Sequence, residues 1–180
     1  MKKIFLMIFC IIYFTSVICE ADTIIAPENG KLSPERISLG GISIFSNSQY
    51  VRKIYGNPKR TKVDYPHSIY YYGKDESFIV YFTNDEEFFK NSTNKQLVTN
   101  IETNANNGIS TPDGICVGMD EAIIIETYGK PEQLQEPNKR TNWNKVYYYW
   151  GNVKLGAGAR CLSFACNNGR ITSIACWYYI

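Results

Sequence analysis

The chain has 180 residues, of which 44% are hydrophobic and 14% aromatic, and its formal net charge is +2 at pH 7. A chain of this length can bury an adequate core. Its near-neutral charge and scattered basic residues exclude the strong positive field that attracts nucleic acid or an anionic membrane.

Residues 1–21 have the pattern of a secretory signal peptide. Lys2 and Lys3 give a positive start, residues 4–17 are almost wholly apolar, and Cys19-Glu20-Ala21 places small side chains where signal peptidase reads them. The apolar stretch is short for a membrane span. We predict cleavage after Ala21, export to the periplasm or the medium, and no stable membrane span afterwards. A lipid anchor on Cys19 and an uncleaved anchor helix are the alternatives.

Removal of Lys2, Lys3 and Glu20 with the leader lowers the net charge from +2 to +1. The following residues, 22–40, are predicted to form an N-terminal arm, because they contain proline and glycine and show no sustained periodicity.

The rest of the chain contains three pairs of matching blocks in the same order. Residues 41–58 align without a gap on residues 114–131, and the shared residues include the Tyr-Gly-x-Pro motif. Residues 69–72 then match 146–149, and residues 98–101 match 171–174. The order predicts one structural unit used twice, with repeat unit 1 at residues 41–107 and repeat unit 2 at residues 108–180.

Each unit is predicted to begin with a short helix. Asn47 or Ser48 can cap the first helix and Asp120 the second. Gly56 and Gly129 can end them in a left-handed conformation.

Strands are expected where β-branched and aromatic residues follow, at 68–72, 78–82, 96–103, 145–150, 161–164 and 170–178. The predicted fold class is α+β: two tandem units, each a short helix or helix pair on an antiparallel sheet, together forming one continuous sheet. One helix covers only one face of such a sheet.

Four cysteines remain after the leader, in a compartment where disulfides persist. Counting outward from a two-residue Asn168-Gly169 turn places Cys161 opposite Cys176, and a longer loop shifts that count by one. We predict a Cys161–Cys176 disulfide, with Cys116 and Cys166 left to pair or stay reduced.

Catalytic chemistry has little support in the sequence. His67 is the single histidine, and no serine or cysteine lies in a recognisable nucleophile motif. Asp85-Glu86-Glu87 lacks the glycine that a calcium loop needs, and the cysteine spacings do not form a zinc site. We therefore predict no catalytic residues, no metal, no cofactor and no enzymatic activity.

The repeated tyrosine triplets predict an aromatic binding surface, because side chains alternate across a strand and one face of the sheet lacks a helix. If Tyr71 and Tyr148 face the helices, the open face carries their neighbours. The opposite assignment exposes Tyr71 and Tyr148. The predicted binding residues are Tyr70, Tyr72, Tyr147, Tyr149, Trp143 and Trp150.

Gly118-Met119-Asp120, Tyr128-Gly129-Lys130-Pro131, Tyr147-Tyr148-Tyr149 and Leu162-Ser163-Phe164 resemble motifs of the small outer-membrane lipoprotein A family. Two such units in tandem resemble the β-lactamase inhibitor protein fold. The resemblance implies helices on one side of a continuous antiparallel sheet and a concave side that binds an enzyme. The first unit departs from the pattern, since Phe45-Ser46 replaces the Gly-Met pair.

The sequence therefore predicts an exported, non-enzymatic protein-binding module that uses the open aromatic face of its sheet, with enzyme inhibition as one form of that role. The expected partner is a protein of the cell envelope or the medium. A structural or assembly accessory of the bacterial cell envelope is the alternative.

Overall fold

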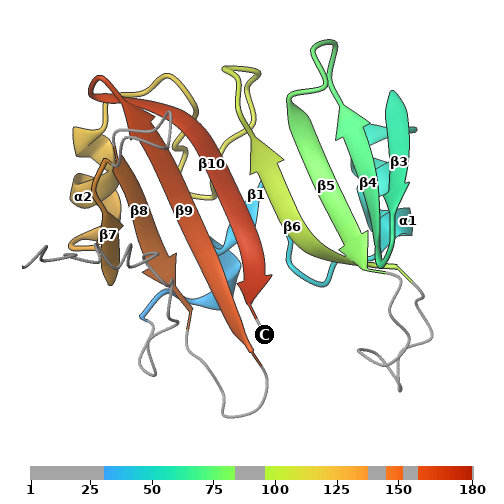
Figure 1. Ribbon diagram of the computed structural model, residues 1–180, viewed down its shortest axis with the longest axis horizontal. Coiled ribbons are helices and arrows are strands. Elements are labelled where there is room, and N and C mark those ends of the chain that lie inside the picture. Colours follow the sequence, from blue (N-terminus) through green and yellow to red (C-terminus); the bar gives the residue numbers. More distant parts are fainter. Residues whose placement is uncertain (1–30, 84–95, 138–144, 152–157, 180) are drawn as a thin grey trace, which may run out of the picture.

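The computed structural model describes residues 31–83, 96–137, 145–151 and 158–179. Within these ranges, eight antiparallel strands form one continuous sheet in the order β3-β4-β5-β6-β10-β9-β8-β7 (Figure 1). The strands are β3 (Arg60–Asp64), β4 (His67–Tyr72), β5 (Phe78–Thr83), β6 (Leu97–Thr103), β7 (Gln133–Gln135), β8 (Lys145–Trp150), β9 (Ala159–Asn167) and β10 (Arg170–Tyr179). The predicted α+β class and the continuous sheet are confirmed.

Two helices lie on the same side of this sheet, α1 (Ser48–Tyr55) behind β3 and β4 and α2 (Ala122–Tyr128) behind β7 and β8. Val51 of α1 and Ile124 of α2 are fully buried in one hydrophobic core that extends along the sheet. We call the opposite side, which carries no helix, the open face.

The start of α1 and the glycines that end both helices follow the predicted capping chemistry, whereas the N-cap residue of α2 is Glu121 and not Asp120. Asn47 accepts a hydrogen bond from the Tyr50 backbone N–H at 2.8 Å, and Gly56 ends α1 with φ 73°. In the second helix Asp120 accepts from the Ala122 N–H at 3.0 Å, and Gly129 ends α2 with φ 75°. Positive φ is where glycine avoids the strain that a Cβ imposes.

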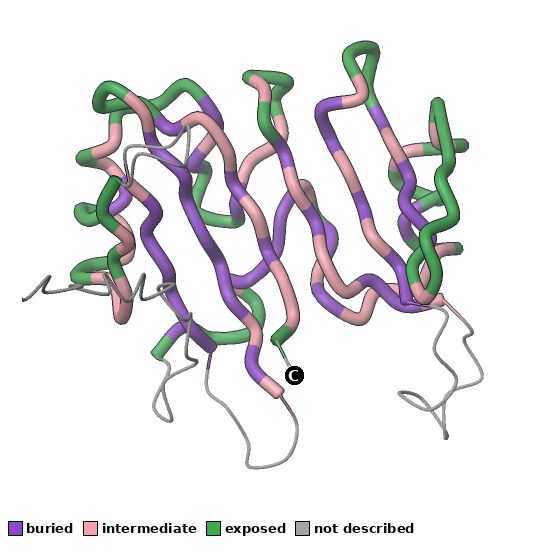
Figure 2. Tube along the Cα trace, in the orientation of Figure 1, coloured by how far each residue is buried: buried purple, intermediate pink, exposed green. Residues whose placement is uncertain are grey.

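The strands at the two edges of the sheet were not predicted. Every residue of β3 is exposed (green in Figure 2), and β7 is three residues long. An edge strand without a buried side lacks the alternation of apolar and polar residues that indicates a strand. Each half of the sheet therefore has one strand more than the three expected.

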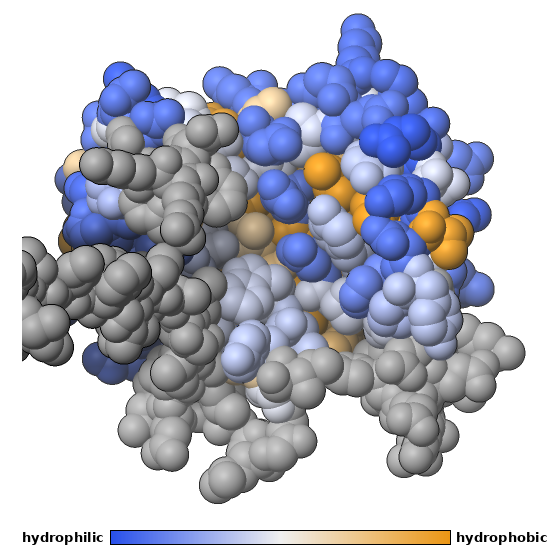
Figure 3. Space-filling model, viewed as in Figure 1, coloured by the Kyte–Doolittle hydropathy of each residue, from blue (hydrophilic) through white to orange (hydrophobic). Residues whose placement is uncertain are grey.

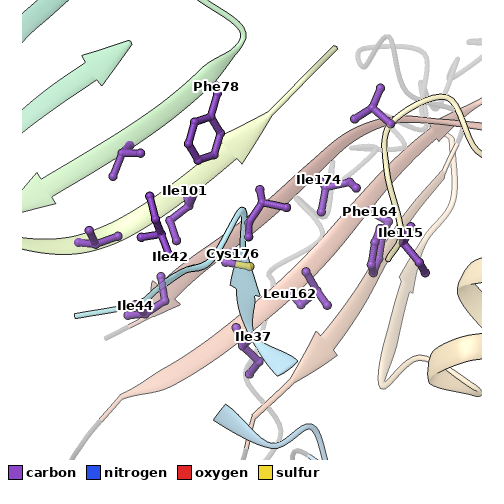
Figure 4. Close-up of a cluster of buried hydrophobic side chains, with 14 of the residues drawn as sticks. Ile37, Ile42, Ile44, Phe78, Ile101, Ile115, Leu162, Phe164, Ile174 and Cys176 are labelled. Atoms are coloured by element: carbon purple, nitrogen blue, oxygen red, sulfur yellow. The ribbon is translucent and has the colours of Figure 1, made fainter. Parts of the chain in front are cut away.

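Part of the predicted N-terminal arm belongs to the core. Pro34–Arg36 form a 3-10 turn, and two short strands, β1 (Ser38–Leu39) and β2 (Ile42–Ser43), pair with each other. Ile37, Leu39 and Ile42 are all fully buried, and β1 packs against β6 and β10. Figure 4 shows Ile37 and Ile42 on the same side of the sheet as Ile101 and Cys176. This segment fills the space beneath the junction between the two halves.

The predicted disulfide between Cys161 and Cys176 is wrong. The Asn168-Gly169 turn has two residues, as expected, with Asn167 opposite Arg170. A β-bulge after Ile171 then shifts the register, so that Cys161 lies opposite Trp177 and not opposite Cys176. A shift of one residue moves a side chain to the other face. All four cysteines of the described residues, Cys116, Cys161, Cys166 and Cys176, carry free thiols.

Candidate functional site: a groove across the open face

The structure places the four tyrosines predicted to bind a partner on the helix side of the sheet, not on the open face. Tyr70, Tyr72, Tyr147 and Tyr149 are between 2% and 6% exposed and belong to the core beneath the helices. Strand alternation separates each triplet between the two faces, but it does not say which face is covered. The open face instead carries Tyr71 and Tyr148, which corresponds to the opposite assignment of the triplets.

These buried tyrosines connect the helices to the sheet through their hydroxyl groups. Tyr149 donates to the Gly129 carbonyl at 2.9 Å, and Tyr147 donates to the Glu121 carboxylate. Arg52 of α1 donates to the Tyr70 hydroxyl at 3.0 Å. Their aromatic rings therefore serve the fold. The predicted Trp143 lies outside the described residues.

Trp150 is on the open face but is fully buried. Its ring lies 5.2 Å from that of Trp177, edge to face, and 6.1 Å from that of Tyr179. Tyr148 contacts the same cluster, 6.3 Å from Trp177. Aromatic pairs in this geometry stabilise a sheet surface, so Trp150 supports the partly exposed Trp177 from beneath.

A groove of about 580 Å³ crosses the middle of the open face. Side chains from six strands line it, from β4 through β5, β6, β10 and β9 to β8, so both halves of the sheet contribute. In Figure 3, apolar side chains reach the surface in the middle of this face, with hydrophilic side chains along its upper and right rims.

The groove is deep because its floor consists of small side chains. Ser163 and Ala165 of β9 lie beside Ala175 and Ser173 of β10, in register. Each of these residues alternates with a large core residue that points to the helix side, so the last two strands present bulk on one face and small groups on the other. We call these four residues the groove floor.

Aromatic side chains form the walls of the groove. Tyr81 of β5 lies on one side, and Tyr148 of β8 and Trp177 of β10 lie on the other. The Trp177 indole N–H donates to the Ser163 hydroxyl at 3.3 Å, and the Tyr148 hydroxyl donates to Gln135 at 2.8 Å. These hydrogen bonds hold both rings in place above the floor.

Glu102 projects into the groove from β6, directly opposite Ala175. It is half-buried, and burial raises the pKa of its carboxyl, while a hydrogen bond with Ser173 partly counteracts that rise. Among the described residues that line the groove there is no lysine or arginine. A carboxylate held in this position costs folding free energy, which makes it a candidate binding group.

Asn100 lies two residues before Glu102 on the same face, opposite Trp177 and Tyr81. A β-bulge at Thr99 adds one residue to β6, so that Thr99 and Asn100 both line the groove. The Asn100 Oδ1 atom is buried and accepts no hydrogen bond from the described residues. A buried acceptor without a donor is uncommon in folded proteins.

The groove has little that could act as a nucleophile. His67 lies at its far end, opposite Thr83 on β5. Burial raises the pKa of the Cys166 thiol to about 12, and it also raises the pKa of the Cys161 and Cys176 thiols well above the ordinary value, so these thiols stay protonated at neutral pH. The parts of the chain that the structure describes contain no group of three or more His, Cys, Asp or Glu side chains placed to hold a metal ion.

Comparison with known proteins gives weak relationships. No family model matches the sequence, and no curated protein matches it. An extracellular SCP-domain protein of Bacillus anthracis is similar over 89% of this chain and 50% of its own, with 10% identity and a TM-score of 0.45. A Streptococcus mutans protein described provisionally as a beta-lactamase inhibitor protein is similar over 73% of this chain and 82% of its own, with 12% identity and a TM-score of 0.26.

The chain thus spans half the length of the first of these structures. In the described ranges, none of the helices has both the length and the hydropathy needed to cross a bilayer.

Sequence reasoning missed the groove, although one signal for it was present. Ser163, Ala165, Ser173 and Ala175 alternate with large apolar residues along two paired strands, which indicates a recess on one face of the sheet. The contribution of Glu102 and Asn100 depends on the pairing of β6 with β10, which brings distant segments together.

Proposed function

We propose that this chain is an exported, non-enzymatic binding module that receives part of another protein in the groove of its open face. The observation that carries the proposal is the groove itself: small side chains at the floor and rigid aromatic walls, contributed by both halves of the sheet. Aromatic rings that are already held in place give large contact area at low entropy cost, which is typical of protein interfaces.

Two further observations support a binding role. Among the described residues no cysteine lines the groove, and His67 lies at one end of it, opposite Thr83, away from the half-buried Glu102 carboxylate. Export is supported by the sequence of residues 1–21, with Lys2, Lys3 and an apolar run; these residues lie outside the described ranges.

The proposal is tested with the chain that lacks residues 1–21, immobilised and exposed to the envelope and secreted proteins of its source. A captured protein is identified, purified and titrated against the chain, and hydrogen exchange maps its footprint. We expect protection on β6, β9 and β10.

Variants that fill the groove decide whether the open face is the interface. Ala175→Trp and Ser173→Arg place bulk on the groove floor and are each expected to weaken the complex about 10-fold or more. Glu126→Arg on exposed α2 is the matched control and leaves affinity unchanged. Unfolding midpoints confirm that each variant is folded. Equal affinity of the floor variants and the wild type overturns the proposal.

An inhibitor-like role, which the sequence resemblance implies, predicts one further result. If the captured protein is an enzyme, adding the wild-type chain lowers its kcat/KM, and adding Ala175→Trp does not. An enzyme that keeps full activity in the complex contradicts inhibition but leaves the binding module intact.

A further inference from the structure

Two hydrogen-bond acceptors stand at consecutive open-face positions in the middle of the sheet. Glu102 and Asn100 are separated by one residue on β6, and both line the groove. Two residues along a strand correspond to about 7 Å, so the two side chains together cover a short stretch of the floor beside Ala175 and Trp177.

Neither acceptor is saturated by the described residues. Asn100 Oδ1 receives no hydrogen bond from the described residues, and Asn100 as a whole is half-buried and lines the groove. The Glu102 carboxylate interacts with one hydroxyl group, that of Ser173, whereas a carboxylate has about four lone-pair positions.

Three donors that line the groove already have acceptors within the protein. The Ser163 hydroxyl donates to the Ala175 carbonyl at 3.4 Å and accepts from Trp177, while the Tyr148 hydroxyl donates to Gln135. A ligand that satisfies Asn100 and Glu102 supplies hydrogen-bond donors, and one that also neutralises the Glu102 carboxylate carries a positive charge. A neutral sugar, which needs donors and acceptors in similar number, fits less well.

We propose that the groove receives an arginine side chain from a protruding loop of the partner protein, an inference that rests on the proposed binding function. A guanidinium carries five N–H donors in a planar fork, so it can donate to acceptors at two neighbouring open-face positions. The single nitrogen of a lysine spans a shorter distance. The rings of Tyr81 and Trp177, which flank Asn100 on the neighbouring strands, offer π-faces to the same cation.

The size of the groove agrees with a loop in addition to one side chain. At about 580 Å³ it lies within the range of pockets that enclose a ligand of several residues. The same sheet already shows how an arginine and a ring combine, since the Arg60 guanidinium stacks 3.6 Å from the centre of the Tyr71 ring and also pairs with Glu76.

The test uses three peptides, acetyl-Gly-Gly-X-Gly-Gly-amide with X arginine, citrulline or lysine, and follows the indole N–H resonance of Trp177 in the chain without residues 1–21. Citrulline keeps the shape of arginine but carries no charge. We expect the arginine peptide to shift the Trp177 resonance with an affinity about 10-fold or more above that of the citrulline peptide, and the lysine peptide to bind more weakly than arginine.

Two carboxylate variants separate the site from general electrostatics. Glu102→Gln is expected to weaken binding of the arginine peptide about 10-fold or more, and Glu126→Gln on exposed α2 removes the same charge without effect. Equal binding of arginine and citrulline, equal losses in the two variants, or a Trp177 shift caused by maltotriose and not by the arginine peptide overturns the inference. Equal affinity for lysine overturns the assignment to arginine.

The inference and the proposed function can fail separately. If the captured partner is lost by Ala175→Trp but retained by Glu102→Gln, the binding module stands and the arginine assignment falls. If neither variant weakens binding of the partner, both the proposed binding groove and the arginine assignment are overturned.

Discussion

Cys161 lies directly opposite Trp177 in the ladder between β9 and β10, so its side chain packs in the open-face cluster while that of Cys176 packs in the core on the helix side. Side chains on opposite faces of one sheet cannot reach each other without disrupting the ladder.

The first prediction follows from this arrangement of the thiols. A peptide map of the oxidised, non-reduced protein should contain no Cys161–Cys176 linkage, and the thermal midpoint should be the same with and without reductant. A structural disulfide contributes about 2–4 kcal/mol, so a clear drop of the midpoint in reductant would contradict the register. Cys176→Ser should lower stability by about 1–3 kcal/mol in either condition, because it buries a hydroxyl among apolar groups.

The second prediction compares two buried tyrosine hydroxyls. Tyr149 donates to the Gly129 carbonyl, whereas the buried Tyr72 hydroxyl has no partner among the described residues. Tyr149→Phe should cost about 1 kcal/mol of unfolding free energy, and Tyr72→Phe should be neutral or stabilising. Denaturant titration measures both.

The corresponding alanine variants test the position of these rings. Tyr72→Ala and Tyr149→Ala should each cost about 3–5 kcal/mol, as expected for large core side chains. Near-wild-type stability of either variant would place its ring outside the core.

The third prediction concerns the pH dependence of stability, to which two glutamates contribute with opposite sign. Burial raises the pKa of Glu102, so the folded state binds a proton more tightly than the unfolded chain and stability falls as pH rises through the folded pKa. Glu102→Gln should therefore raise the thermal midpoint at about pH 7 and have no effect at about pH 3.5, where the carboxyl is protonated in both states. Burial and the nearby Glu102 carboxylate raise the pKa of Tyr81, an ionisable neighbour across the sheet, so it stays neutral in this range.

Glu121 provides the contrast. Burial pushes its pKa upward, but hydrogen bonds from Lys145, at 2.9 Å, and from Tyr147 outweigh burial and leave the pKa lowered. Its stabilising effect is present above the unfolded pKa and is lost as pH falls. Glu121→Gln should lower the midpoint at about pH 7, with a difference that shrinks on acidification. Parallel pH profiles for the two variants would contradict both assignments.

The fourth prediction tests the N-terminal segment. Ile37 is fully buried beneath the junction of the two halves, and Tyr55 of α1 fixes the end of the segment by donating to the Gly40 carbonyl at 2.6 Å. Ile37→Ala should lower the unfolding free energy by about 2–5 kcal/mol. Lys31→Ala, at an exposed position, should change it by less than about 0.5 kcal/mol. Equal, small effects would show that the segment is dispensable.

The elements with strong local signals could be predicted from the sequence. Glycines at positive φ end both helices, the Asn47 side chain caps the first, and the two-residue turn at Asn168-Gly169 is as expected. The exposed edge strands β3 and β7 have no buried side, so no alternation indicated them.

The groove depended on information that is not local. The bulges at Thr99 and Thr172 shift the register by one residue, and neither threonine carries a local signal that marks a bulge. Which tyrosines of each triplet are buried likewise depends on the side of the sheet against which the helices pack. Because Glu102 meets Ala175 through the pairing of β6 with β10, the binding groups could not be brought together from the sequence alone.

The position of β10 has a consequence for biosynthesis. It is the last strand of the described chain to be made, yet it lies in the centre of the sheet, between β6 and β9. During translation the hydrogen-bonding edge of β6 waits without its partner until every other strand has emerged. Completion of the native sheet thus depends on β10, which joins the two halves through its ladders with β6 and β9.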